Sequence, residues 1–209
     1  FWKDWINLIK GGYRKVVKKE NSQDGKIFWY LVIATIPAGI LSLVLDKVSE
    51  IIFGENINFQ MKIIACTLII MGIILYIVDK KSKSTVDYNN ITLKQAVLVG
   101  ISQAIAAAFP GVSRSGITMT VARSLKIDRE SAAKLSFMLA MPITFAAVIF
   151  ELPKFTFDIA LLLGILASFI TGVLVIKFLM NYLKKGSFKA FAIYRIIFGI
   201  IIILVSFMR

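Results

Sequence analysis

The sequence has no histidine and a single cysteine. Histidine is the usual acid–base group near neutral pH, so its absence excludes sites that depend on an imidazole. Cys66 can form neither an internal disulfide nor the cysteine pair of a zinc site, and its place in an apolar run predicts a small buried side chain. The sequence also lacks a Walker-type loop and a carboxylate pair at metal-binding spacing, which removes the common nucleotide and metal motifs.

Charged residues are scarce as well, at 18% of 209 residues, whereas 58% are hydrophobic and the mean hydropathy is +0.80. An average soluble domain has about 25% charged residues. Several apolar runs reach about 20 residues, enough to cross roughly 30 Å of hydrocarbon. The loops are too short for a soluble domain, so we predict one all-α integral membrane domain over residues 1–209, a polytopic helical bundle. The expected spans are 27–45, 61–78, 131–152, 158–183 and 188–208.

The charge that is present is mostly positive, with a formal net charge of +13. The basic residues stand at the ends of apolar runs, so membrane topology and anionic headgroups explain them better than nucleic acid does. Residues 1–20, with Trp2 and Trp5, read as an interfacial stretch of the kind that follows a transmembrane helix. Because the chain starts at Phe1 and not at a methionine, we expect a further segment upstream.

Residues 91–125 are long enough to cross the membrane but are interrupted by FPGVSRSG at 109–116. Lysine and arginine accumulate in short cytoplasmic loops. A crossing path would put the later basic groups outside, whereas a hairpin that re-enters keeps them with the earlier ones. The sequence therefore predicts a re-entrant hairpin with its tip at 109–116, cytoplasmic basic loops and an external C-terminus. The basic residues left outside by this path are Lys47, Lys62, Lys154 and Arg209.

Such a tip must be buried in protein or line a water-filled cavity, because lipid cannot satisfy irregular backbone. A half-helix that begins after Gly111 would direct free N–H groups and a positive dipole end into that cavity. Ser113, Arg114, Ser115 and Thr118 add hydroxyls and a guanidinium, donors that suit phosphate. An arginine inside the membrane costs about 2.5 kcal/mol or more, which marks Arg114 as functional. The alternative is a hinge at which Arg114 snorkels or pairs with a buried carboxylate.

Two further polar residues lie in apolar surroundings. Gln103, two turns before Pro110, either faces the same cavity as a ligand for phosphate or a metal, or makes a hydrogen bond between helices. Arg195 is the second cation within the membrane, about two turns into the last span. Snorkelling toward the cytoplasmic side and a functional role are both open for Arg195.

The stretch PGVSRSGIT, with GISQAIAAAF before it and SFMLAMP and FAIYRIIFG after it, resembles the second signature of the undecaprenyl-diphosphatase (bacitracin resistance) family. The resemblance covers essentially the whole chain. It implies inverted-topology repeats, each with a re-entrant helix-loop-helix. It also implies hydrolysis of undecaprenyl diphosphate to undecaprenyl phosphate at the bacterial cell membrane, which recycles the carrier lipid for peptidoglycan synthesis, with Mg²⁺ or Ca²⁺ as cofactor.

By this resemblance Ser113, Arg114 and Thr118 have catalytic roles, binding the diphosphate and stabilising charge on the transferring phosphoryl group. The expected substrate-binding residues are Gly111, Ser115, Gly116 and Gln103. The family's first signature, of the type EGxTEFLPISSTGH, is absent, and Gln103 and Ala107 occupy the repeat-related positions of its glutamates. We therefore expect no metal ligands in this chain, and expect these residues alone to be catalytically incomplete.

A second reading, from another class, is a polyprenyl-phosphate transporter or flippase, because broken helices at the midplane also occur in transporters. A membrane scaffold would leave Arg114 without a role, and no basic, aromatic-interleaved surface for nucleic acid is apparent. The expected partners are a polyprenyl diphosphate and membrane lipids, and the sequence is compatible with a homo-oligomer.

Overall fold

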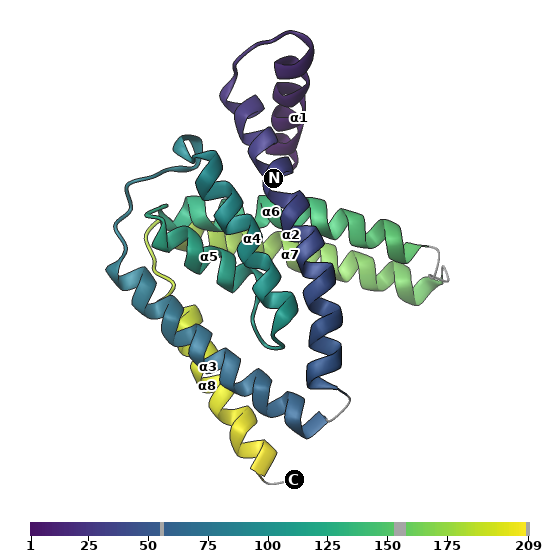
Figure 1. Cartoon of the computed structure of the whole chain (residues 1–209), viewed down its shortest axis with the longest axis vertical. Coiled ribbons are helices and arrows are strands. Elements are labelled where there is room, and N and C mark those ends of the chain that lie inside the picture. The colour runs from purple at the N-terminus through teal and green to yellow at the C-terminus, as the bar shows by residue number, and fades with distance from the viewer. Residues whose placement is uncertain (55–56, 153–157, 208–209) are drawn as a thin grey trace.

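The computed structural model describes residues 1–54, 57–152 and 158–207, and it is built from helices (Figure 1). Three residues of the predictions lie outside the described residues. They are Lys154 and Arg209, expected on the outer side, and Met208, expected at the end of the last span. The helices are α1 (Trp2–Val17), α2 (Gln23–Phe53), α3 (Ile57–Lys81), η1 (Tyr88–Asn90), α4 (Leu93–Ala108), α5 (Arg114–Ser124), α6 (Arg129–Glu151), α7 (Ile159–Leu183) and α8 (Lys189–Phe207).

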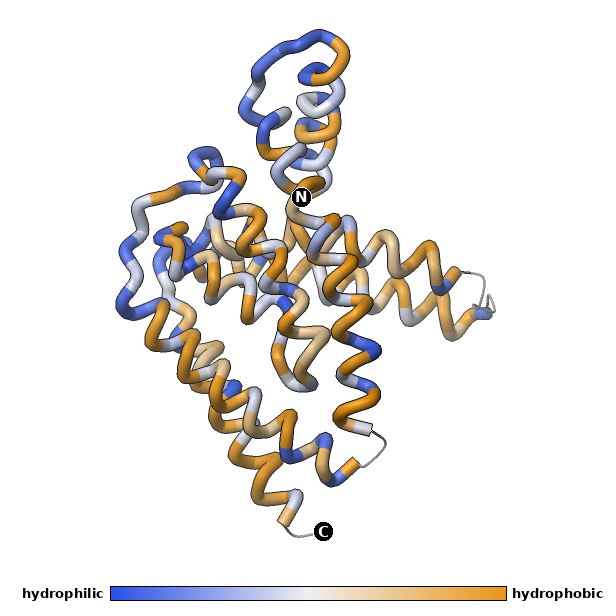
Figure 2. Tube along the Cα trace, viewed as in Figure 1, coloured by the Kyte–Doolittle hydropathy of each residue, from blue (hydrophilic) through white to orange (hydrophobic). Residues whose placement is uncertain are grey.

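Five of these helices, α2, α3, α6, α7 and α8, are long and apolar enough to cross a membrane. These helices consist mainly of apolar residues, many of which are exposed, while hydrophilic residues gather in the connections from α1 to α2 and from α3 to α4 (Figure 2). The prediction of an all-α polytopic membrane protein is confirmed. The expected burial of Cys66 is wrong, since its side chain is exposed on α3. In a membrane protein an apolar run also covers the lipid-facing exterior, so it does not imply burial.

Helices α3 and α8 form a close antiparallel pair (Figure 1). A β-carbon on Gly72 of α3 would lie 3.0 Å from the carbonyl oxygen of Ala192, and one on Gly199 of α8 would lie 2.9 Å from that of Ala65. Small residues on both helices therefore allow the backbones to approach closely, as is usual between membrane helices.

Helices α4 and α5 form a hairpin packed against α3. The hairpin begins at Thr92, whose capping box with Gln95 satisfies the first turn of α4. It ends beside the C-terminal end of α3, where an isolated β-bridge joins Val86 and Ile127. Between these ends, the Thr67 hydroxyl donates a 2.6 Å hydrogen bond to the carbonyl oxygen of Pro110. Because α3 spans Ile57–Lys81, the hairpin tip reaches the middle of that helix.

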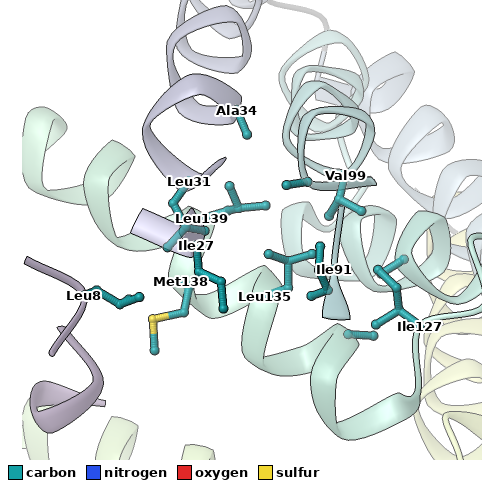
Figure 3. Packing of buried hydrophobic residues seen from close by; sticks show 13 residues of the cluster. Leu8, Ile27, Leu31, Ala34, Ile91, Val99, Ile127, Leu135, Met138 and Leu139 are labelled. Atoms are coloured by element: carbon teal, nitrogen blue, oxygen red, sulfur yellow. The ribbon is translucent and has the colours of Figure 1, made fainter. Parts of the chain in front are cut away.

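The main hydrophobic core lies where α1, α2, α4, α5 and α6 meet (Figure 3). Leu31 and Ala34 of α2 face Val99 of α4, and Leu135 and Met138 of α6 fill the space below them. This core holds the α4–α5 hairpin on the side opposite α3. The hairpin is therefore fixed between two helical layers, which is what a backbone break within an apolar region requires.

Candidate phosphate site

The hairpin tip depends on Gly111. Its φ is +87°, a left-handed conformation that side chains disfavour, and a β-carbon there would lie 2.3 Å from Thr67 Oγ1 and 2.8 Å from the Ile64 backbone. Glycine thus lets the chain reverse while it touches the middle of α3.

Helix α5 starts immediately after this turn. The Ser113 hydroxyl caps it by accepting a 3.1 Å hydrogen bond from the Gly116 backbone N–H. The first N–H groups of a helix have no partner within it, and they carry the positive end of the helix dipole. The sequence therefore positions an anion-attracting helix end at the tip, as predicted from its residue types.

Arg195 of α8 reaches the same place. A β-carbon on Gly116 would lie 2.5 Å from Arg195 Nη1, so the guanidinium rests on the first turn of α5. The residue is only 6% exposed, and neither Nη1 nor Nη2 has a hydrogen-bond partner among the described residues. A buried cation without a partner is costly, and here it also stands against the positive end of a helix. An anion at this point would relieve both penalties.

A cavity of about 450 Å³ opens at this point. One end is polar, formed by Gly111, Ser113, Ser115 and Gly116 of the tip together with Arg195. The remaining wall is apolar and rich in aromatic rings from α6 and α8. Its residues are Leu68, Leu75, Met119, Phe137, Leu179, Phe188, Phe191, Tyr194 and Phe198.

The other expected site residues lie outside this lining. Arg114 is exposed and points toward α6, where its Nη2 lies 3.5 Å from Thr144 Oγ1. The Thr118 hydroxyl is buried and shares a 2.6 Å hydrogen bond with Ser136 of α6. Gln103 is 2% exposed, and both of its side-chain polar atoms lack a partner within the described ranges. The tip therefore presents two faces, one toward Arg195 and one toward α6.

The cavity suits an anion and not a divalent cation. Its described lining contains no carboxylate, and no cluster of three or more histidine, cysteine or acidic residues occurs in the described part of the chain. Mg²⁺ and Ca²⁺ require several oxygen ligands with negative charge nearby. The residues present do not fit either ion, and we derive no step through a metal.

Sequence reasoning did not assign Arg195 to the site. The available signal was that Arg114 and Arg195 are the two basic residues left within the membrane once the others are assigned to the loops. An intramembrane arginine is a functional candidate by default, but snorkelling explained Arg195 equally well until the position of α8 was known.

The fold defines a multi-pass helical membrane protein, in which a cavity lined by the hairpin tip and Arg195 lies within the helical bundle. The chain belongs to the family of the bacitracin resistance protein BacA, whose model matches residues 1–201.

Curated relatives named undecaprenyl-diphosphatase support this assignment. The protein of Moorella thermoacetica is 38% identical over 212 residues, covering 100% of this chain and 77% of the relative. The protein of Pelotomaculum thermopropionicum is 37% identical, covering 100% of this chain and 76% of the relative. That of Gemmatimonas aurantiaca is 38% identical, with 97% and 75% covered. The chain is thus a hydrolase of this family and spans about three quarters of the length of these relatives.

Proposed function

We propose that this protein hydrolyses undecaprenyl diphosphate to undecaprenyl phosphate, with the diphosphate bound at the hairpin tip. The observation that carries the proposal is the buried guanidinium of Arg195 against the N-terminus of α5, with no hydrogen-bond partner for Nη1 or Nη2 in the described part of the chain. Arginine offers a planar fork to phosphoryl oxygens and stays charged when desolvated. The names of the relatives support the choice of a lipid diphosphate.

The cavity favours an amphiphile over a free anion. Its polar end carries the serines of the tip and Arg195, while Phe191, Tyr194 and Phe198 line the part that extends along α8. A diphosphate at the polar end would leave its polyprenyl chain against this apolar wall, which is as compatible with the chain as the surrounding lipid is. One cavity therefore matches both halves of the proposed substrate.

In the proposed reaction the bond between the terminal phosphorus and the bridging oxygen breaks, and water supplies the oxygen that replaces it. The products are inorganic phosphate and the lipid monophosphate. Negative charge shifts to the bridging oxygen and spreads over the terminal phosphoryl oxygens, so donors fixed beforehand lower the barrier. This chain supplies Arg195, the hydroxyl of Ser115 and the N-terminal N–H groups of α5 on one face, and Arg114 at the edge facing α6.

We further propose that the hairpin re-enters from the cytoplasmic side of the bacterial cell membrane. Three observations support this orientation. The two ends of the hairpin lie together beside the C-terminal end of α3. The basic residues Arg129, Lys184 and Lys185 line one pocket near the same end. The tip contacts Thr67, halfway along α3, which corresponds to a midplane position for a spanning helix.

The experiment is phosphate release from undecaprenyl diphosphate by the purified protein, together with binding of inorganic pyrophosphate. Arg195→Gln should weaken pyrophosphate binding roughly tenfold to a hundredfold, since a hydrogen bond to a charged group contributes about 1.5–3 kcal/mol. Lys189→Gln, on the exposed start of α8, is the matched control and should bind as the parent does. Equal affinity in all three proteins would overturn the site. Movement of polyprenyl phosphate across vesicles without phosphate release would support the transporter instead.

A further inference from the structure

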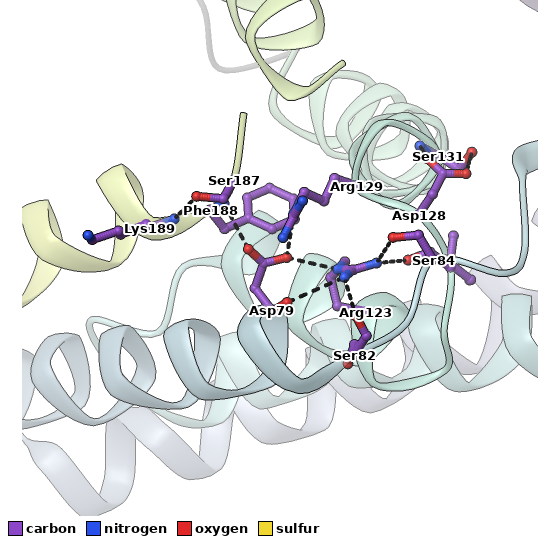
Figure 4. A network of polar contacts seen from close by, with 11 residues as sticks. Asp79, Ser82, Ser84, Arg123, Asp128, Arg129, Ser131, Ser187, Phe188 and Lys189 are labelled. Carbon is purple, nitrogen blue, oxygen red and sulfur yellow. Dashed lines mark hydrogen bonds and ion pairs between the residues drawn. The ribbon is translucent and has the colours of Figure 1, made fainter. Parts of the chain in front are cut away.

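Asp79, near the C-terminal end of α3, is a buried carboxylate at the junction of four helices (Figure 4). Its Oδ1 accepts hydrogen bonds from Nε of Arg123 at 2.9 Å and from Nε of Arg129 at 2.8 Å. Its Oδ2 accepts a 3.1 Å hydrogen bond from the backbone N–H of Phe188, just before α8. One side chain therefore ties α3 to the end of α5, the start of α6 and the start of α8.

The α5 side of this junction is fully bonded. The guanidinium of Arg123, whose side chain is 1% exposed, also donates to Ser84 Oγ and to the carbonyl oxygens of Asp79, Ser82 and Ile127. Together with the bond from Nε to Asp79 Oδ1 they make five hydrogen bonds, as many as arginine has N–H donors. Because five directional bonds hold one side chain of α5, they fix the rotation of α5 about its axis and its position along the axis relative to α3.

The junction and the phosphate site are separated by the same number of residues on both helices. Gly116 precedes Arg123 by seven residues on α5, and Arg195 follows Phe188 by seven residues on α8. Helix α5 runs toward Asp79 and α8 runs away from it, so on both helices seven residues, about 10.5 Å along the axis, separate the junction from the phosphate site. Equal distances from a common anchor bring Arg195 level with Gly116.

Helix α3 repeats this spacing. Gly72 precedes Asp79 by seven residues, and a β-carbon there would lie 3.4 Å from Arg195 Cβ and 3.0 Å from the carbonyl oxygen of Ala192. At the level of the site, α8 thus packs against a glycine of α3 on one side and rests on a glycine of α5 on the other. A shift of α8 along its axis would move Arg195 away from both.

We propose that Asp79 is a positioning residue for the phosphate site. It holds Phe188 and Arg123 at one level, and so sets the height at which the guanidinium of Arg195 meets the N-terminus of α5. This role rests on the proposed function, because it acts through the cation that binds the diphosphate. A merely structural ion pair would stabilise the fold without acting through Arg195.

A double-mutant cycle on pyrophosphate affinity separates the two roles. Asp79→Asn keeps the size of the side chain and removes its charge, and we expect it to weaken binding about tenfold in the parent protein. In the Arg195→Gln background the same substitution should change affinity less than about twofold, because the group it positions is gone. A structural role predicts the same fold-change in both backgrounds, and that result would overturn the proposal.

Two controls accompany the cycle. Asp46→Asn removes a carboxylate from an exposed position of α2 and should leave affinity unchanged. Arg129→Gln removes the other arginine from Asp79 but keeps the hydrogen bonds of Asp79 to Arg123 and Phe188, so affinity should also stay near that of the parent. If Arg129→Gln weakens binding as much as Asp79→Asn does, the general loss of an ion pair explains the effect and the proposal fails.

The design also distinguishes this proposal from the proposed function. No pyrophosphate binding by the parent, or binding unaffected by Arg195→Gln, would overturn the proposed function and the role of Asp79 with it. Binding that depends on Arg195 but not on Asp79 would overturn only the positioning role. If Asp79→Asn does not fold, Arg123→Lys takes its place in the cycle, because lysine keeps the charge but loses the forked geometry.

Discussion

The guanidinium of Arg195 rests on the backbone of Gly116, in the first turn of α5, at a position where a β-carbon would lie 2.5 Å from Nη1. This contact joins a cation from the C-terminal helix to the helix end at the hairpin tip. In the proposed function, this contact supplies the cation that complements the N-terminus of α5 at the tip.

Gly116→Ala should therefore impair the site without destabilising the protein. The added β-carbon would lie 2.5 Å from Arg195 Nη1 and displace the guanidinium, so we expect about tenfold weaker pyrophosphate binding. Alanine favours a helix over glycine by about 1 kcal/mol, which keeps thermal stability level or higher.

Gly39→Ala on α2 is the matched control, because nothing lies within 4 Å of the added carbon. It should raise stability to a similar extent and leave pyrophosphate affinity unchanged. Undiminished affinity in Gly116→Ala would mean that Arg195 does not need this approach to α5.

Gly111→Ala should destabilise the tip. The position combines a φ of +87° with contacts of 2.3 Å and 2.8 Å from an added β-carbon to Thr67 and Ile64. The left-handed conformation alone costs about 1–2 kcal/mol for an alanine, and the overlap with α3 adds to this cost. Thermal unfolding in detergent measures the sum.

Gly54→Ala is the comparison at a second positive φ, +55°, where no atom of the described residues lies within 4 Å of the added β-carbon. We expect the loss of stability in Gly111→Ala to exceed that in Gly54→Ala. Equal losses would show that the tip does not press against α3 as the structure indicates.

Two ion pairs, one buried and one partly exposed, should differ widely in their effect on stability. Arg123→Ala would leave the Asp79 carboxylate, which is 5% exposed, without its best-buried partner, and such a change costs about 3–5 kcal/mol. Asp4→Ala would break the pair between Asp4 and Lys134, whose side chains are 37% and 26% exposed, at a cost of about 0–1 kcal/mol. Unfolding midpoints of the two variants provide the test, and similar midpoints would contradict it.

The re-entrant path predicts which loops share a side of the membrane. In a Cys66→Ser background, single cysteines at Lys83, Lys126 and Lys185 should react with an impermeant maleimide from the same side, and one at Lys47 from the opposite side. A hairpin that crossed the membrane would instead place the cysteines at Lys83 and Lys126 on opposite sides.

Much of the architecture is local in the sequence and could be predicted from it. Apolar runs of about 20 residues identify membrane helices because the hydrocarbon thickness sets their length. The Pro110–Gly111 break identifies a turn because proline and glycine act on their own backbone. The serines and Arg114 that follow predict a phosphate-binding tip by their chemistry, and this stays a prediction.

The sequence by itself thus determined the membrane class, the family and the location of the broken helix. Only the tertiary structure decided which cation meets the tip, and that Asp79 pairs with Arg123 across 44 positions of the chain. Hydropathy does not specify which helices are neighbours, because every apolar face is equally compatible with lipid and with another helix. Close packing at Gly72 and Gly199, and the hydrogen bonds of Asp79, remove that ambiguity and place Arg195 at the tip.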